Sequence, residues 1–200
     1  MSTTVRELRK AETREALLAA GRAVFVREGY HRASLDRVAK EAGFTKGAVY
    51  AHFPTKADLL LAIYEERSAV RAARIRQDAA TVATVDALRR QMVDGWTAVL
   101  RDERDWSLLL IEFWVHVARD DDLRERFAAA HGEIRRAMAD VVRQVAEREG
   151  RPLPMDPDAF ACASQALGNG LNLEAFLGRD DVPALFDAAS AMLFPHEEAP

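Results

Sequence analysis

Four consecutive residues have the types and spacing needed to contact DNA bases and phosphates at the start of a helix. The Thr45 hydroxyl can cap the helix and can also hold a phosphate oxygen. Lys46 can reach a base edge or a phosphate, and Ala48 can touch a thymine methyl group. Gly47 and Ala48 have almost no side chain, so the backbone can approach the bases closely. These residues predict the first turn of a helix that reads DNA.

The residues before this turn have the spacing of a helix-turn-helix. Ser34 is a candidate N-cap, and Ala39 is small where two helices must approach closely. Gly43 follows where the first helix must end, and it supplies a positive φ without steric cost. Val49 then provides the apolar contact back to the first helix. The combination predicts two short helices at a steep angle, the second free to enter a major groove.

A longer helix is predicted directly after this motif. Pro54 breaks the chain, and Thr55 with Asp58 forms a capping box. Lys56 lies near the start of the helix, so its charge adds to the positive end of the helix dipole and favours a phosphate. The helix begins apolar and becomes basic, as expected of a connector between two domains.

Charge is unevenly distributed along the chain. Residues 1–60 carry eleven basic and seven acidic side chains, a net charge of +4. The whole chain has a net charge of −4, so the remainder carries −8. A basic head on an acidic body predicts a DNA-binding end and a body with another task. The single Cys162 excludes an internal disulfide and a cysteine zinc site, and its apolar setting predicts a core position.

The hydrophobic periodicity predicts an all-α fold of about nine helices. We expect a helix-turn-helix DNA-binding domain at residues 1–54 and a helical ligand-binding and dimerisation domain at residues 55–200, with a frayed tail from residue 195. The expected helices span about 10–28, 34–42, 46–53, 55–79, 84–101, 104–119, 121–149, 157–178 and 181–194.

The segment from Thr13 to about Leu61 resembles the DNA-binding domain of the TetR/AcrR family of bacterial transcriptional regulators. The matching residues are Phe25, Gly29, Tyr30, Ser34, Val38, Ala39, Glu41, Ala42, Gly43, Thr45, Lys46, Gly47, Val49, Tyr50, His52, Phe53, Pro54 and Lys56. The resemblance implies an all-helical homodimer that usually represses transcription and leaves its operator when the body binds a small molecule. Ala33 departs from the family's frequent Thr or Ser, so one possible phosphate contact is missing.

The resemblance also implies that Tyr50, His52 and Lys56 contact DNA phosphates. The alternatives are a half-buried tyrosine and ordinary surface polarity. The complete set of predicted DNA-binding residues is Ser34, Thr45, Lys46, Gly47, Ala48, Tyr50, His52 and Lys56.

In the body, Trp96, Phe113, His116 and Phe160 are candidate ligand-binding residues, with ordinary core packing as the alternative for each aromatic group. Glu112 and His116 share one helix face, where they either line a pocket or form an intrahelical hydrogen bond. A metal site would need a third ligand that the sequence does not place, so no metal is expected.

The predicted helix at 157–178 carries a polar stripe and several small residues. Gln165, Asn169 and Asn172 form the stripe, and Gly168 permits close packing. In the resembled family the last two long helices pair with those of a second subunit. The stripe is therefore interpreted as part of a dimer interface, or else as polar groups of the pocket.

The sequence and the resemblance thus predict a DNA-binding regulator without a cofactor, a repressor released from operator DNA by a small hydrophobic or amphipathic effector. Neither a leader nor an apolar run long enough to cross a bilayer is present, so we expect a cytoplasmic protein without membrane contact. One alternative is an all-α enzyme, but the paired Glu-x-x-His motifs of metal-carboxylate bundles do not occur. Another is an adaptor whose head binds proteins. A third alternative is a transcriptional activator.

Overall fold

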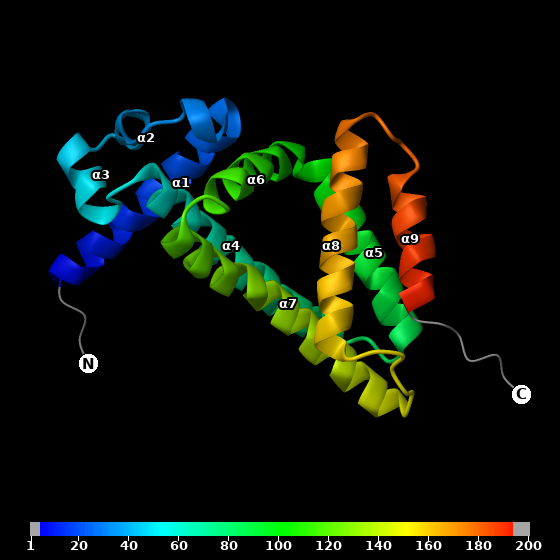
Figure 1. Cartoon of the computed structure of the whole chain (residues 1–200). Helices are drawn as coiled ribbons and strands as arrows, with labels where there is room; N and C mark the ends of the chain where they lie inside the picture. Colours follow the sequence, from blue (N-terminus) through cyan, green and yellow to red (C-terminus); the bar gives the residue numbers. More distant parts are fainter. Residues whose placement is uncertain (1–4, 194–200) are drawn as a thin grey trace, which may run out of the picture. The chain divides into compact units, whose positions relative to one another are not determined.

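The computed structural model of the chain describes residues 5–193, with the backbone alone at residues 78, 79 and 193. Within these residues the chain forms nine α-helices and no strand (Figure 1), so the predicted all-α fold is confirmed. The frayed tail expected from residue 195 lies outside the described part. The helices are α1 (Val5–Arg32), α2 (Leu35–Ala42), α3 (Lys46–His52), α4 (Lys56–Ala79), α5 (Val85–Asp102), α6 (Arg104–Val117), α7 (Asp121–Glu149), α8 (Pro157–Phe176) and α9 (Val182–Leu193).

The helix-turn-helix formed by α2 and α3 has the caps that the sequence predicts. The Ser34 hydroxyl accepts a hydrogen bond from the Arg37 N–H at 3.3 Å. Gly43 ends α2 in the left-handed conformation, with φ 72° and ψ 22°. The Thr45 hydroxyl then accepts from the Ala48 N–H at 3.2 Å and begins α3. Local side-chain chemistry therefore fixes both ends of the turn.

The start of α4 is a reciprocal capping box. The Thr55 N–H donates to the Asp58 carboxylate at 3.1 Å, and the Asp58 N–H donates to the Thr55 hydroxyl at the same distance. Asp156 caps α8 directly before Pro157. These contacts satisfy N–H groups that a helix N-terminus leaves without intrahelical partners.

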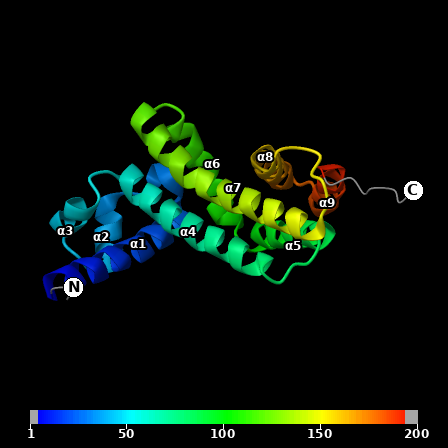
Figure 2. The same ribbon diagram turned by 90° about the horizontal axis from the view of Figure 1, so that it is seen from below.

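The chain divides into two compact units. The first unit, over the described residues, comprises 5–67 and 105–128. It contains α1, α2 and α3, which cluster at the N-terminal end of the chain (Figure 2), together with the first half of α4 and nearly all of α6. Its core includes Leu17, Val38, Val49 and Phe113, none of which has exposed surface. The unit extends beyond the boundary expected at residue 54, because helices distant in sequence pack with the head.

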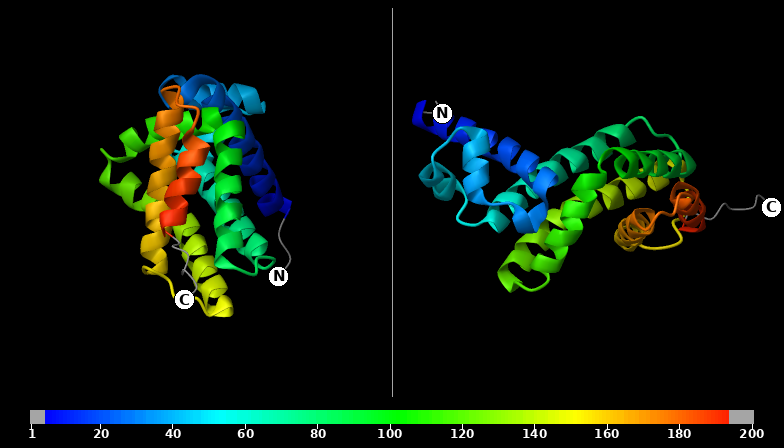
Figure 3. Two further views of the ribbon diagram at one scale, coloured as in Figure 1. Left: turned by 90° about the vertical axis from the view of Figure 1, so that its right-hand side faces the viewer. Right: turned by 90° about the horizontal axis from the view of Figure 1, so that it is seen from above.

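The second unit comprises residues 68–104 and 129–193. Within it α8 and α9 lie side by side in every view (Figures 1 and 3), and α5 packs against α9. Gly168 is buried, and a Cβ there would lie 2.8 Å from the Trp96 indole nitrogen. Gly168 therefore supports packing within one subunit. Cys162 is exposed, so the predicted core position was wrong: it lies on the face of α8 that turns away from the unit's core.

Candidate functional site

Helix α3 has one buried face and one exposed face. Val49 is completely buried and anchors the helix, whereas Thr45, Lys46 and Gly47 are exposed at its start. Tyr50 is 51% exposed, and Ala48 is half-buried. The Thr45 hydroxyl, the Lys46 ammonium and the Tyr50 phenol thus lie within one and a half helical turns, beside Gly47, which has no side chain. This surface can donate hydrogen bonds to phosphates and allow the backbone close to the base edges.

The charge of Lys46 is already partnered in the free protein. Its ammonium donates a hydrogen bond to the Asp36 carboxylate on α2. This hydrogen bond and the carboxylate charge raise the pKa of Lys46, so its cationic form is favoured. Both side chains are largely exposed, so Lys46 can exchange Asp36 for a phosphate or a base at little cost.

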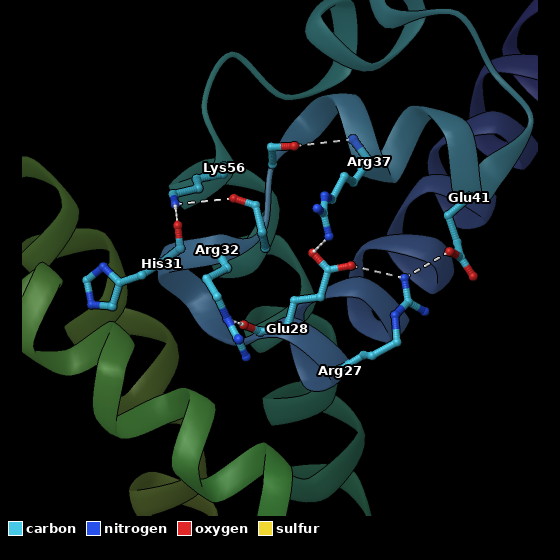
Figure 4. A network of polar contacts seen from close by, with 9 residues as sticks. Arg27, Glu28, His31, Arg32, Arg37, Glu41 and Lys56 are labelled. Carbon is cyan, nitrogen blue, oxygen red and sulfur yellow. Dashed lines mark hydrogen bonds and ion pairs between the residues drawn. The ribbon is translucent and has the colours of Figure 1, made fainter.

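An ion-pair network at the end of α1 fixes α2 against it (Figure 4). The Glu28 carboxylate pairs with Arg37 of α2 at 2.7 Å and with Arg27 at 3.3 Å. Arg27 also donates to Glu41 of α2 at 3.1 Å. No ion-pair role was predicted for these residues from the sequence. In the sequence, the network is visible only as alternating charges on two predicted helices, a pattern that is also typical of a solvent-exposed helix face.

His52 and Lys56 have neighbours that were not predicted. Burial lowers the pKa of His52, and the positive charges of Lys10 and Arg14 lower it further. The Lys56 ammonium donates to the backbone carbonyls of Tyr30 and His31 at 2.8 and 3.0 Å. A weaker hydrogen bond reaches the Ala33 carbonyl at 3.3 Å. A phosphate contact by Lys56 would have to replace hydrogen bonds within the protein.

Phe113 and His116 of α6 lie together around Tyr30 in the first unit. The Tyr30 ring centroid is 5.4 Å from that of Phe113 and 4.9 Å from that of His116. Tyr30 is only 2% exposed, and burial, with smaller contributions from two carboxylates, raises its pKa to about 12. The two candidate ligand residues of α6 therefore contact the end of α1, a neighbour that the sequence did not indicate.

Glu112 does not form the intrahelical hydrogen bond to His116 that was one of its two interpretations from the sequence. One of its carboxylate oxygens accepts a hydrogen bond from the backbone N–H of Tyr30 at 2.8 Å. Its partner is thus a backbone group 82 residues away, and no hydrogen bond to His116 is present in the described structure. No cluster of three or more potential metal ligands occurs among residues 5–193.

Trp96 and Phe160 belong to different apolar clusters of the second unit. Trp96 stacks on Phe186 of α9, with ring centroids 4.4 Å apart. Phe160 packs with Val85 and other residues of α5 and α7. Two surface depressions of this unit, at the end of α7, are lined by neither Trp96 nor Phe160. The four candidate ligand residues are therefore distributed over three apolar groups.

The polar stripe of α8 is half-buried at Gln165, Asn169 and Asn172. The side-chain oxygen of Asn172 is buried, and no hydrogen bond to it occurs in the described part of the chain. None of the described helices combines the length and apolar character needed to cross a membrane.

Comparison with known proteins covers both ends of the chain. Residues 17–63 match the family described as bacterial regulatory proteins, tetR family. Residues 85–194 match the C-terminal domain of BetI-type transcriptional repressors. The transcriptional regulator TtgR of Pseudomonas putida is 28% identical over 184 residues, which is 88% of this chain and 86% of TtgR. Three other curated relatives are 45% identical, but the chain covers only 26%, 42% and 25% of their length.

Solved structures share the fold at low sequence identity. The regulator FadR of Bacillus subtilis in complex with stearoyl-CoA has a TM-score of 0.71 and 16% identity, over 90% of this chain and 97% of FadR. A putative regulator of Saccharomonospora viridis in complex with choline has a TM-score of 0.74 and 20% identity, over 94% of this chain and 97% of that one. These structures carry very different ligands on one fold.

Proposed function

The chain belongs to the tetR family of bacterial regulatory proteins, and we propose that it is a DNA-binding repressor released from its operator by a small molecule. The observation that carries the proposal is the helix-turn-helix itself. Its two caps, its left-handed Gly43 and the buried Val49 present the exposed side of α3 as one surface. We place this activity in the cytoplasm, where a bacterial repressor meets its operator. We assign the chain no enzymatic role.

The proposed DNA contacts divide into two kinds. Lys46, Gly47 and Ala48 face the bases, because they lie on the first turn of the reading helix. Ser34, Thr45, Tyr50, His52 and Lys56 complete the proposed set as groups that hold phosphates. The exposure of Tyr50 supports this assignment, whereas the carbonyl partners of Lys56 favour an indirect contribution.

A mobility-shift or anisotropy assay with the intergenic DNA beside the gene tests this function. Wild-type protein should bind a palindromic duplex more tightly than a scrambled one, and Tyr50→Phe should weaken both complexes similarly, because a phosphate contact is blind to sequence. Failure to bind any duplex from that region, with the protein still folded, would favour the alternative of a protein-binding adaptor.

The effector is proposed to be hydrophobic or amphipathic, because aromatic residues dominate the candidate set. Trp96 is the best supported member: its indole N–H is buried, and no hydrogen-bond acceptor for it occurs among the described residues. A ligand oxygen could accept that hydrogen. Phe160 is a second candidate, while Phe113 and His116 are proposed to respond to the effector through their contact with Tyr30.

The functional form is proposed to be a homodimer through α8 and α9. Leu177 is 83% exposed and Met192 is 82% exposed, and Leu173 of α8 is 48% exposed. Such a set of large apolar groups on neighbouring helices is typical of a protein interface. A two-fold axis through this interface would give two reading helices and a palindromic operator.

A further inference from the structure

Helix α1 breaks at Gly29, shortly before its end. Gly29 has φ 74° and ψ 167°, a conformation open essentially to glycine alone. The ψ value turns the following peptide group away from the helical direction. The N–H of Tyr30 therefore begins a new short helical segment and needs an acceptor from elsewhere, since a helix start leaves its N–H groups without internal partners.

Glu112 of α6 supplies that acceptor. Its carboxylate lies 2.8 Å from the Tyr30 nitrogen, in a setting that is partly buried. The contact also explains why a glycine is needed at position 29, because a Cβ there would lie 2.9 Å from the other carboxylate oxygen. A hydrogen bond from a backbone N–H to an ionised carboxylate is among the stronger hydrogen bonds in proteins.

Lys56, the first residue of α4, holds the other end of the same segment. Its ammonium donates to the carbonyls of Tyr30, His31 and Ala33, and it lies 4.6 Å from the centre of the Tyr30 ring. Figure 4 shows this side chain against the His31 backbone. Residues 30–33 are thus held at their N–H end by a carboxylate from α6 and at their C=O end by an ammonium from α4.

This segment leads directly into the DNA-binding surface. Ser34 follows it and caps α2, and α2 packs against both α1 and α3. A displacement of residues 30–33 would therefore move the start of α2, and with it the whole helix-turn-helix. The position of this segment depends on a residue of α6 that lies 82 residues from Tyr30 in the sequence.

We propose that Glu112 is a positioning residue for DNA binding, which sets the α1–α2 turn through the Tyr30 N–H and thereby connects α6 to the reading helix. The inference rests on the proposed DNA-binding function but assigns that function a residue outside the helix-turn-helix. It also provides a path from α6 to the head that does not pass through α4.

Two variants at one position test the role of the acceptor. Glu112→Ala removes the acceptor, whereas Glu112→Gln keeps a carbonyl oxygen and removes the charge. Glu125→Ala, an exposed carboxylate of α7 in the same unit, is the matched control for loss of a negative charge. Each full-length protein is tested for affinity to its specific duplex and for amide hydrogen exchange at Tyr30.

We expect Glu112→Ala to speed Tyr30 exchange and to weaken specific DNA binding about tenfold, at a temperature where it remains folded. Glu112→Gln should recover most of both properties, and Glu125→Ala should match wild type. Equal DNA affinity of Glu112→Ala and Glu125→Ala would overturn the proposal, as would equal losses in the Ala and Gln variants. If wild type bound no DNA while Tyr30 exchange still responded to Glu112→Ala, the DNA-binding function would fail instead, and with it the positioning role.

Discussion

Replacement of Gly29 by alanine should destabilise the protein far more than the same change at Gly43. Both glycines have positive φ, at 74° and 72°, and both lie in the first unit. Gly43 is in the left-handed helical region, with no atom within 4 Å of an added Cβ. Its substitution by alanine therefore carries only the conformational strain, about 1–2 kcal/mol.

Gly29 adds one further cost to its conformational strain. Its conformation is one that other residues adopt only at about 1–3 kcal/mol, and an added Cβ would lie 2.9 Å from the Glu112 carboxylate. That carboxylate would have to move, which would break its hydrogen bond to the Tyr30 N–H. Loss of a hydrogen bond to a charged group costs about 1.5–3 kcal/mol. The total for Gly29→Ala is then about 2.5–6 kcal/mol of unfolding free energy.

Urea denaturation followed by circular dichroism measures these values, and a double-mutant cycle isolates the contact. In a Glu112→Ala background the hydrogen bond is already absent, so Gly29→Ala should cost only its strain. The difference between the two backgrounds should be about 1.5–3 kcal/mol, the value of the broken hydrogen bond. Equal costs for Gly29→Ala in both backgrounds would refute the contact, and equal costs at Gly29 and Gly43 would refute the reasoning from local geometry.

Three further outcomes are expected. DNA affinity, measured by anisotropy at constant salt, should rise as pH falls from 7 towards 5.5. Burial and nearby cations lower the pKa of His52, and a bound phosphate would raise it, so binding would take up a proton. The pH dependence should disappear in His52→Gln. Leu177→Glu should give a folded monomer in light scattering, whereas Val70→Glu, on exposed α4 surface, should leave the dimer intact. Phe113→Ala should lower the unfolding free energy by about 3–5 kcal/mol and weaken DNA binding in parallel, because the ring is fully buried. Unchanged stability in urea denaturation would instead identify Phe113 as pocket lining.

Local features of the sequence predicted most of the fold. Ser34, Thr45 and Thr55 begin helices because each hydroxyl accepts a hydrogen bond from the N–H three residues later, and such contacts need no knowledge of the rest of the chain. Gly43 is similar, since its left-handed conformation follows from the position at which α2 must stop. The apolar periodicity then indicated the buried face of most helices, although not that of α8, where Cys162 is exposed.

Contacts between distant segments could not be predicted in the same way. Cys162 and Gly168 lie on one apolar helix, and the sequence does not tell which of them faces the core; in the structure Gly168 meets Trp96 and Cys162 is exposed. Likewise Phe113 and Phe160 are aromatic residues of similar helices, yet one packs on Tyr30 and the other on α5 and α7. Periodicity identifies a helix, whereas the face that an apolar helix buries and the partners that it meets depend on the packing of whole helices.

The Lys56 ammonium has a different partner in the structure from the one predicted from the sequence. A cation at a helix N-terminus favours an anion, and from sequence the available anion is a DNA phosphate. In the structure, the Lys56 ammonium instead donates hydrogen bonds to three carbonyl oxygens of residues 30–33. Burial lowers the pKa of Lys56, and the nearby Glu112 charge opposes this shift. The negative charge of Glu112 favours the cationic form of Lys56, so loss of Glu112 would also weaken the hydrogen bonds that Lys56 donates. The α1–α2 turn is therefore held by two coupled contacts, that of Glu112 and that of Lys56. A movement of either α4 or α6 would displace the start of α2.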